Sequence, residues 1–171
     1  MIKLIKPRVD LEQAYLEMLE EWKREGGRLV PWVLGFDASD FPALIAQLEG
    51  YSRGVGITET MVEHSTYLLV DSENRVLGAV NIRHRLNEWL LHSGGHIGYG
   101  IRPGERRKGY ASEALRQALE IAKTMGIDRA LVVCDKTNTG SARTIQKNGG
   151  QLENEVEKDG AIMQRYWIEI K

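Results

Sequence analysis

The chain has 171 residues, with 42% hydrophobic and 27% charged residues and a formal net charge of −1 at pH 7. This balance excludes wholesale disorder and disfavours a general nucleic-acid-binding protein, which would be more basic. The single cysteine, Cys134, excludes an internal disulfide and fits a reducing compartment. We therefore expect one domain over residues 1–171 in the cytoplasm, with neither a signal peptide nor a membrane-spanning segment.

The first half of the chain alternates between segments with strand and helix periodicity. Asp10 and Gln13 have the spacing of a capping box, which predicts the start of a helix. Pro42 is compatible with the first turn of a second helix. The predicted elements are a strand at 2–6, a helix from Asp10 to Gly26, a helix from Ser39 or Asp40, and a hairpin of strands at 65–70 and 75–83.

The second half contains a long amphipathic helix followed by a continuous apolar run, Ala130–Cys134. Such a run is typical of a strand buried on both faces, as in a parallel pair joined by a crossover helix. The whole order predicts an α/β (α+β) fold with a mixed, mostly antiparallel sheet of six to seven strands and helices on both faces. The predicted elements are strands at 96–102 and 129–135, helices at 110–125 and 141–147, and a closing hairpin at 151–157 and 162–170.

The segment Gly98–Ser112 is predicted to form the end of a strand, a basic glycine-containing loop and the start of a helix. A helix N-terminus has unsatisfied N–H groups and the positive end of the helix dipole, so it favours phosphate. Residues 102–116 contain five basic and two acidic side chains, a local net charge of +3. The charge pattern therefore predicts a local anion site in a protein that is not basic overall.

Two common phosphate motifs fail in this loop. Gly104–Gly109 has the glycine spacing of a Walker loop, but Tyr110–Ala111 replaces the required lysine and hydroxyl residue. A dinucleotide fingerprint could begin at Gly98 and Gly100, but Pro103 occupies the position of its third glycine. Neither a P-loop nor a dinucleotide site is therefore expected.

A third phosphate pattern, [Gln/Arg]-x-x-Gly-x-[Gly/Ala], is matched by Arg106, Gly109 and Ala111. In this position, after a strand and opening a helix, it resembles the acetyl-coenzyme A loop of the GNAT-type N-acetyltransferase superfamily. The following strand, 130–135, with Asn138, Ser141 and Gly149, is similar to the second coenzyme-binding segment of that family. Segments 81–88 and 147–150 resemble a bacterial subgroup of predicted acetyltransferases.

The resemblance implies a GNAT-like domain with a central pair of splayed parallel strands and a coenzyme-binding core at about residues 65–150. It implies acetyl transfer from acetyl-CoA to a primary amine of a small molecule, an amino acid or a peptide N-terminus, by direct attack in a ternary complex. The family bulge in the strand before the loop would fall at Gly98–Gly100. Two histidines, His92 and His96, are spaced like metal ligands, but no further ligand cluster supports them, so we expect no metal.

The resemblance also implies which residues hold the coenzyme. Backbone N–H groups near Tyr99–Ile101 would face the thioester carbonyl, and those of Arg107–Ala111 would bind the pyrophosphate. The full expected set is Tyr99, Ile101, Arg106, Arg107, Lys108, Gly109, Tyr110, Ala111, Ser112, Asn138 and Ser141.

The residues expected to act as the general base and the general acid differ from those that are common in the family. Relatives often carry a glutamate two residues before the first glycine of the bulge, where this chain has His96. A histidine can accept an amine proton, and the alternative is a structural histidine at a strand start. Many relatives have a tyrosine acid where this chain has Ile145. Weaker candidates for the base are Glu59, Glu63 and His84, and Cys134 fits a packing thiol better than a covalent nucleophile.

Two other functions stay open from the sequence. A non-catalytic acyl-CoA sensor is compatible with the missing tyrosine, and an RNA-associated protein is disfavoured by the overall charge. Residues 10–63 contain eleven acids and four bases, which could wall a site for a cationic amine or could simply form solvated helix faces. Trp22, Trp32, Phe36 and Tyr51 could line that site or fill the core. Dimers are common in such folds, so a homodimer is allowed, and neither a nucleic acid nor a membrane is expected as a partner.

Overall fold

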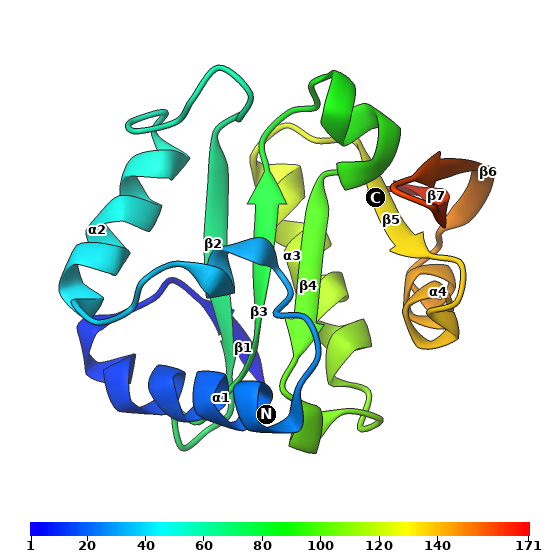
Figure 1. Cartoon of the computed structure of the whole chain (residues 1–171). Coiled ribbons are helices and arrows are strands. Elements are labelled where there is room, and N and C mark those ends of the chain that lie inside the picture. Colours follow the sequence, from blue (N-terminus) through cyan, green and yellow to red (C-terminus); the bar gives the residue numbers. More distant parts are fainter.

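The computed structural model describes all 171 residues and contains seven strands and four α-helices (Figure 1). The mixed α/β class and the order of elements predicted from the sequence are confirmed. The elements are β1 (Lys3–Ile5), α1 (Glu12–Glu25), α2 (Phe41–Ser52), β2 (His64–Val70), β3 (Val76–Arg83), β4 (Ile97–Ile101), α3 (Tyr110–Thr124), β5 (Arg129–Asp135), α4 (Thr139–Lys147), β6 (Gln151–Lys158) and β7 (Ala161–Glu169).

The strands form two sheets where the sequence predicted one. The first sheet has the order β1-β2-β3-β4 and the second has the order β5-β7-β6, with antiparallel neighbours throughout. The division falls between β4 and β5, the strands that correspond to the expected splayed pair. Both strands begin at a common junction, and their C-terminal ends open toward the same cleft, which is lined by Ile101 and Asn138.

A short junction joins β4 to β5 at their N-terminal ends. The backbone N–H of His96 donates to the carbonyl oxygen of Leu131 at 2.7 Å. The N–H of Leu131 donates in return to Nδ1 of the His96 ring at 2.9 Å. Gly95 allows this approach, because a Cβ there would lie 2.7 Å from the Leu131 carbonyl oxygen. Beyond the junction the strands separate, so the edge of β4 that faces β5 has no strand partner.

The expected bulge at Gly98–Gly100 is absent, because β4 pairs with β3 in one continuous register from Ile97 to Ile101. The two strands instead approach closely through facing glycines. A Cβ on Gly78 of β3 would collide with the carbonyl oxygen of Gly100. The glycines that suggested a bulge are therefore needed for close packing of backbone against backbone.

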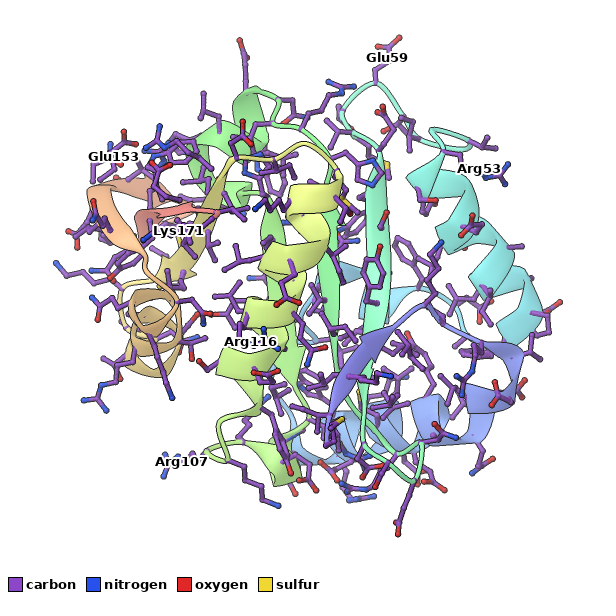
Figure 2. All side chains as sticks on the ribbon, turned by 180° about the vertical axis from the view of Figure 1, so that it is seen from behind. Arg53, Glu59, Arg107, Arg116, Glu153 and Lys171 are labelled. Atoms are coloured by element: carbon purple, nitrogen blue, oxygen red, sulfur yellow. The ribbon has the colours of Figure 1, made fainter.

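Helices cover both faces of the first sheet, as predicted. Helices α1 and α2 lie against one face, and α3 lies against the other, as the opposite views of Figures 1 and 2 show. Alternation along the strands sends neighbouring side chains into two separate cores. Leu68 and Ala79 belong to the core under α1 and α2, and Leu69, Val80 and Ile82 belong to the core under α3.

The predicted start of the second helix is confirmed, and that of the first is displaced. Asp40 caps α2 by accepting the Ala43 N–H at 3.1 Å. The Asp10 carboxylate instead accepts from the side chain of Arg8, residues 9–11 form a 3₁₀ turn, and α1 begins at Glu12. A local ion pair therefore replaces the expected capping box. None of the helices is both long and apolar enough to cross a membrane.

Candidate active site

A cleft of about 740 Å³ opens between the end of β4, the first turn of α3 and the first turn of α4. The connection after α1 forms its remaining wall through Gly26, Gly27, Arg28 and Val30. Every coenzyme-binding residue predicted from the sequence lines this cleft except Lys108, whose Nζ pairs with Glu105 at 2.9 Å. Segments far apart in the sequence thus converge on one surface, as the resemblance implied.

The N-terminus of α3 opens into the cleft without a cap. Gly109, at the N-cap, has φ +82°, and Arg107 has φ +64°. No backbone N–H of residues 107–112 donates to an acceptor within the protein. By contrast, side chains cap α2 and α4. The six amides therefore form a set of donors without acceptors in the protein, at the positive end of a 15-residue helix, which suits an anion.

Cationic side chains surround these amides. The guanidinium of Arg106 lies 5.3 Å from the centre of the Trp22 ring, and its Nε donates to the Ile101 carbonyl at 2.9 Å. Arg107 is exposed and projects from the loop at the edge of the molecule in Figure 2. The sequence prediction missed three further cations that line the cleft, namely Arg28, Arg143 and Lys147. The four-residue spacing of Arg143 and Lys147 on a predicted helix could have revealed two of them.

Helix α1 and the connection after it are held by shape against β4 and by charge against the loop that follows β4. A Cβ on Gly100 would collide with the carbonyl oxygen of Val30 and would lie 2.9 Å from the Trp22 ring. Nearby, the Glu21 carboxylate accepts from Arg102 and from the Gly104 N–H, each at 2.9 Å. The bond from Arg102 is the main reason why the pKa of Glu21 is lowered. One wall of the cleft therefore depends on contacts between α1 and the strand-loop segment.

Tyr99 joins β4 to the first turn of α4 across the cleft. Its hydroxyl lies 2.7 Å from Oγ of Ser141, whose N–H donates to Oδ1 of Asn138 at 3.0 Å. Burial raises the pKa of Tyr99 to about 12 and that of Cys134 to about 11, so both groups are protonated at neutral pH. A protonated buried thiol supports the packing interpretation of Cys134.

His96 is buried, and its ring has a structural contact. Because Nδ1 accepts the Leu131 N–H, the neutral ring carries its proton on Nε2 and has no free lone pair. Burial, and then the charge of Arg83, lowers the pKa of His96 to about 4. To accept a proton the ring would have to release the junction between β4 and β5. The assignment of His96 as the base stays a prediction, and this geometry weighs against it.

The other proton-transfer candidates lie apart from the cleft. Glu59 is exposed, Glu63 pairs with Arg85 at 3.3 Å, and Nε2 of His84 lies 2.7 Å from the Ser65 hydroxyl. Ile145 is fully buried in the core under α3. Most of the acidic side chains between residues 10 and 63 are exposed, which favours solvated helix faces over an acidic wall.

A second hollow, of about 880 Å³, lies between the C-terminal half of α3 and β7, away from the basic loop. Four of its six charged side chains are paired within the protein, and Lys123 and Lys171 make no ion pair. Arg116 bonds to Glu113 and Glu120, and Arg129 bonds to Glu169 while it stacks on Trp167. No group of three or more His, Cys, Asp or Glu side chains is arranged to hold a metal ion. The cleft at α3 is therefore the stronger candidate for an anionic ligand.

Comparison with known proteins connects this cleft to one family. A family model described as an acetyltransferase (GNAT) domain matches residues 3–151. No curated protein matches the sequence significantly.

Solved structures share the fold at low sequence identity. A putative GNAT-family acetyltransferase from Bordetella pertussis aligns with a TM-score of 0.67 at 14% identity, covering 98% of this chain and 95% of that one. A putative acetyltransferase from Salmonella typhimurium, solved with its cofactor acetyl-CoA, aligns with a TM-score of 0.64 at 12% identity over 99% and 94%. Mutant forms of a spermidine/spermine N-acetyltransferase from Vibrio cholerae align with a TM-score of 0.62 at 15% identity over 99% and 95%.

Proposed function

The chain belongs to the GNAT family of acetyltransferases, whose domain model covers most of its length, and from that premise we propose that it transfers an acetyl group from acetyl-CoA to a primary amine. The acceptor is a small molecule, an amino acid or a peptide N-terminus. The observation that supports this most strongly is the set of six uncapped amides at the start of α3, inside a cleft lined by cations. The Salmonella relative that shares the fold carries acetyl-CoA as its cofactor.

The cleft offers a suitable partner for each part of acetyl-CoA. The N–H groups of residues 107–112 hold the pyrophosphate, with added charge from Arg106 and Arg107. Arg28, Arg143 and Lys147 supply cations for the remaining phosphate. The unpaired edge of β4 at Tyr99–Ile101 binds the amide groups of the pantetheine arm in the manner of an added strand. Asn138 and Ser141 close the cleft from α4.

The reaction requires the protein to position the amine and the thioester, and it does not require a covalent intermediate with the protein. The neutral amine nitrogen attacks the thioester carbonyl carbon, the carbon–sulfur bond breaks, and coenzyme A leaves as its thiolate. The attacking nitrogen loses one proton to water, and the thiolate takes up a proton from water to give the free thiol. Backbone N–H groups on the free edge of β4 stabilise the negative charge that develops on the carbonyl oxygen. The splay between β4 and β5 leaves room for the amine and the thioester to meet, so the fold supplies orientation.

Release of free thiol from acetyl-CoA over a panel of amines tests this proposal. Turnover with at least one amine is expected, at a rate well above that of hydrolysis. Tight binding of acetyl-CoA without thiol release for any amine would instead identify a non-catalytic sensor of acyl-CoA.

Replacing His96 by asparagine separates a base from a positioning residue. The asparagine Oδ1 can take the place of Nδ1 and accept the Leu131 N–H, but it does not titrate. If His96 only holds the junction, kcat should change by less than about threefold and the acidic limb of the pH–rate profile should persist. His96→Ala should lower the melting temperature, because it leaves the Leu131 N–H without an acceptor. A loss of about 100-fold in kcat for His96→Asn, with loss of the acidic limb, would establish the histidine as the base.

A further inference from the structure

Arg83, the last residue of β3, is a buried arginine without a carboxylate partner. Three arginines are buried in this chain, with exposed fractions of 9% for Arg83, 5% for Arg102 and 6% for Arg165. Arg102 is paired with Glu21, and Arg165 is paired with Glu153. No acidic side chain makes an ion pair with Arg83, so its charge is not balanced within the protein. A buried charge is normally paired, and this exception calls for an external anion.

The guanidinium of Arg83 has hydrogen-bond donors to spare. Its Nη1 donates to the carbonyl oxygens of Gly94 and Gly95, at 3.1 and 3.3 Å. Neither Nε nor Nη2 donates to a protein acceptor, and neither is among the fully buried polar atoms that lack a partner, so both keep contact with solvent. Burial lowers the pKa of Arg83 to about 10, which leaves the group charged at neutral pH. The pair Nε and Nη2 matches the two oxygens of a carboxylate.

A second unused donor lies on the neighbouring strand β2. His64 lies directly opposite Arg83 in the pairing of β2 with β3. The Asn81 amide donates to His64 Nδ1 at 2.8 Å, so the neutral ring carries its proton on Nε2. That Nε2 is buried and has no partner, and the exposed fraction of His64 is only 3%. Burial, and then the charge of Arg83, keeps the pKa of His64 at about 4, so this ring stays neutral at pH 7.

These donors lie on the face of the sheet that α1 and α2 cover, beside the proposed reaction centre. Asn81 pairs with Gly98 of β4, so the two residues share that face. A Cβ on Gly98 would lie 3.3 Å from Nη2 of Arg83, so the guanidinium rests directly on the glycine backbone. Aromatic rings border the His64 side, with ring centres at 4.9 Å for Tyr51 and 5.6 Å for Trp32. The guanidinium of Arg83 thus lies against β4 one residue before Tyr99–Ile101, where the thioester is proposed to lie.

We propose that Arg83 and His64 bind the carboxylate of the acceptor, and that the acceptor is a small amino acid with its amine close to its carboxylate. This inference rests on the proposed acetyltransferase function and narrows its substrate. Nε and Nη2 of Arg83 donate to the two carboxylate oxygens, and Nε2 of His64 adds a third donor. The amine is then directed toward Gly98–Gly100. A polyamine would place additional positive charge near Arg83, so the same geometry disfavours it.

Matched pairs of amino acids and their α-amides test the proposal, because each pair differs only in the carboxylate. Steady-state acetylation is measured with acetyl-CoA, and binding of each compound is measured by calorimetry on protein saturated with CoA. We expect the best amino acid to exceed its amide by about 100-fold in kcat/KM and in affinity. Arg83→Gln should raise KM for the amino acid by a similar factor, change kcat little and leave the amide unaffected. Arg83→Lys should restore part of the preference, since it keeps the charge but loses the paired geometry.

Arg85→Gln is the matched control, because Arg85 lies two residues further along and is exposed. It should leave the preference for the carboxylate unchanged. Amides that bind and react as well as the acids, or spermidine as the best acceptor, would overturn the proposal. So would a preference that survives in a folded Arg83→Gln variant, which would mean that Arg83 serves only to hold Gly94 and Gly95. If amino acids bind through Arg83 but no amine releases thiol, the acetyltransferase proposal fails while the carboxylate site stands.

Discussion

Replacing Gly109 by aspartate is expected to weaken acetyl-CoA binding by at least about 100-fold, while the protein stays folded. Nothing lies within 4 Å of a Cβ at this position, so the new side chain meets no steric barrier. The φ of +82° costs about 1 kcal/mol for a residue with a side chain, and aspartate is among those that tolerate it best. The carboxylate would stand against the pyrophosphate at the amides that open α3, where the repulsion is largest.

Two further variants separate charge from backbone strain. Gly109→Asn has nearly the same shape without the charge and should keep the affinity for acetyl-CoA within about tenfold of the original protein. Gly126→Asp places the same carboxylate after the other end of α3, at φ +85° and again in open space. It should cost somewhat more stability, because the carboxylate then lies near the negative end of the helix dipole, and it should leave the affinity unchanged. Calorimetry measures all three, and equal affinity for Gly109→Asp and the original protein would place the coenzyme elsewhere.

Replacing Gly100 by alanine is expected to destabilise the protein by about 1–3 kcal/mol and to disrupt coenzyme binding. The added Cβ would collide with the carbonyl oxygen of Val30, and it would lie 2.9 Å from Trp22. The connection after α1 would have to move away from β4, and that connection is one wall of the cleft. Chemical denaturation and calorimetry with acetyl-CoA measure the two effects.

Gly35→Ala is the control for this substitution. No positive φ and no neighbour within 4 Å constrain Gly35, so alanine there should change the free energy of unfolding by less than about 1 kcal/mol. An unfolding midpoint for Gly100→Ala equal to that of Gly35→Ala, with normal affinity for acetyl-CoA, would show that Val30 does not wall the site.

The strands and helices were largely predictable from local pattern. The amphipathic stripe of residues 110–125 and the apolar run Ala130–Cys134 led to α3 and β5 within one residue at each end. The anion site at the basic loop was also predictable from local sequence, because glycine, basic residues and the unsatisfied amides of a helix start follow one another along the chain. For that reason the sequence located one end of the cleft without any knowledge of the fold.

Features that depend on long-range contacts were not predictable. The bond between the His96 ring and Leu131 joins residues 35 positions apart, and it changes the interpretation of the histidine. Arg28 lies in a connection without periodicity and lines the cleft beside Val30, which packs on Gly100. Nothing local to Arg83 shows that it lacks a carboxylate, since arginines and acids are both common along the chain. The fold determines which charged side chains form pairs, so the proposed binding site for the acceptor could be recognised only in the structure.

The most direct measurement is the shift of backbone amide resonances while CoA is titrated into the protein. The six N–H groups of residues 107–112 have no acceptor in the free protein, so binding of a pyrophosphate should give them the largest shifts and protect them from solvent exchange. The amides of β7 and of the C-terminal half of α3 should change little. Large shifts around that second hollow, with residues 107–112 unaffected, would contradict a coenzyme held at the start of α3.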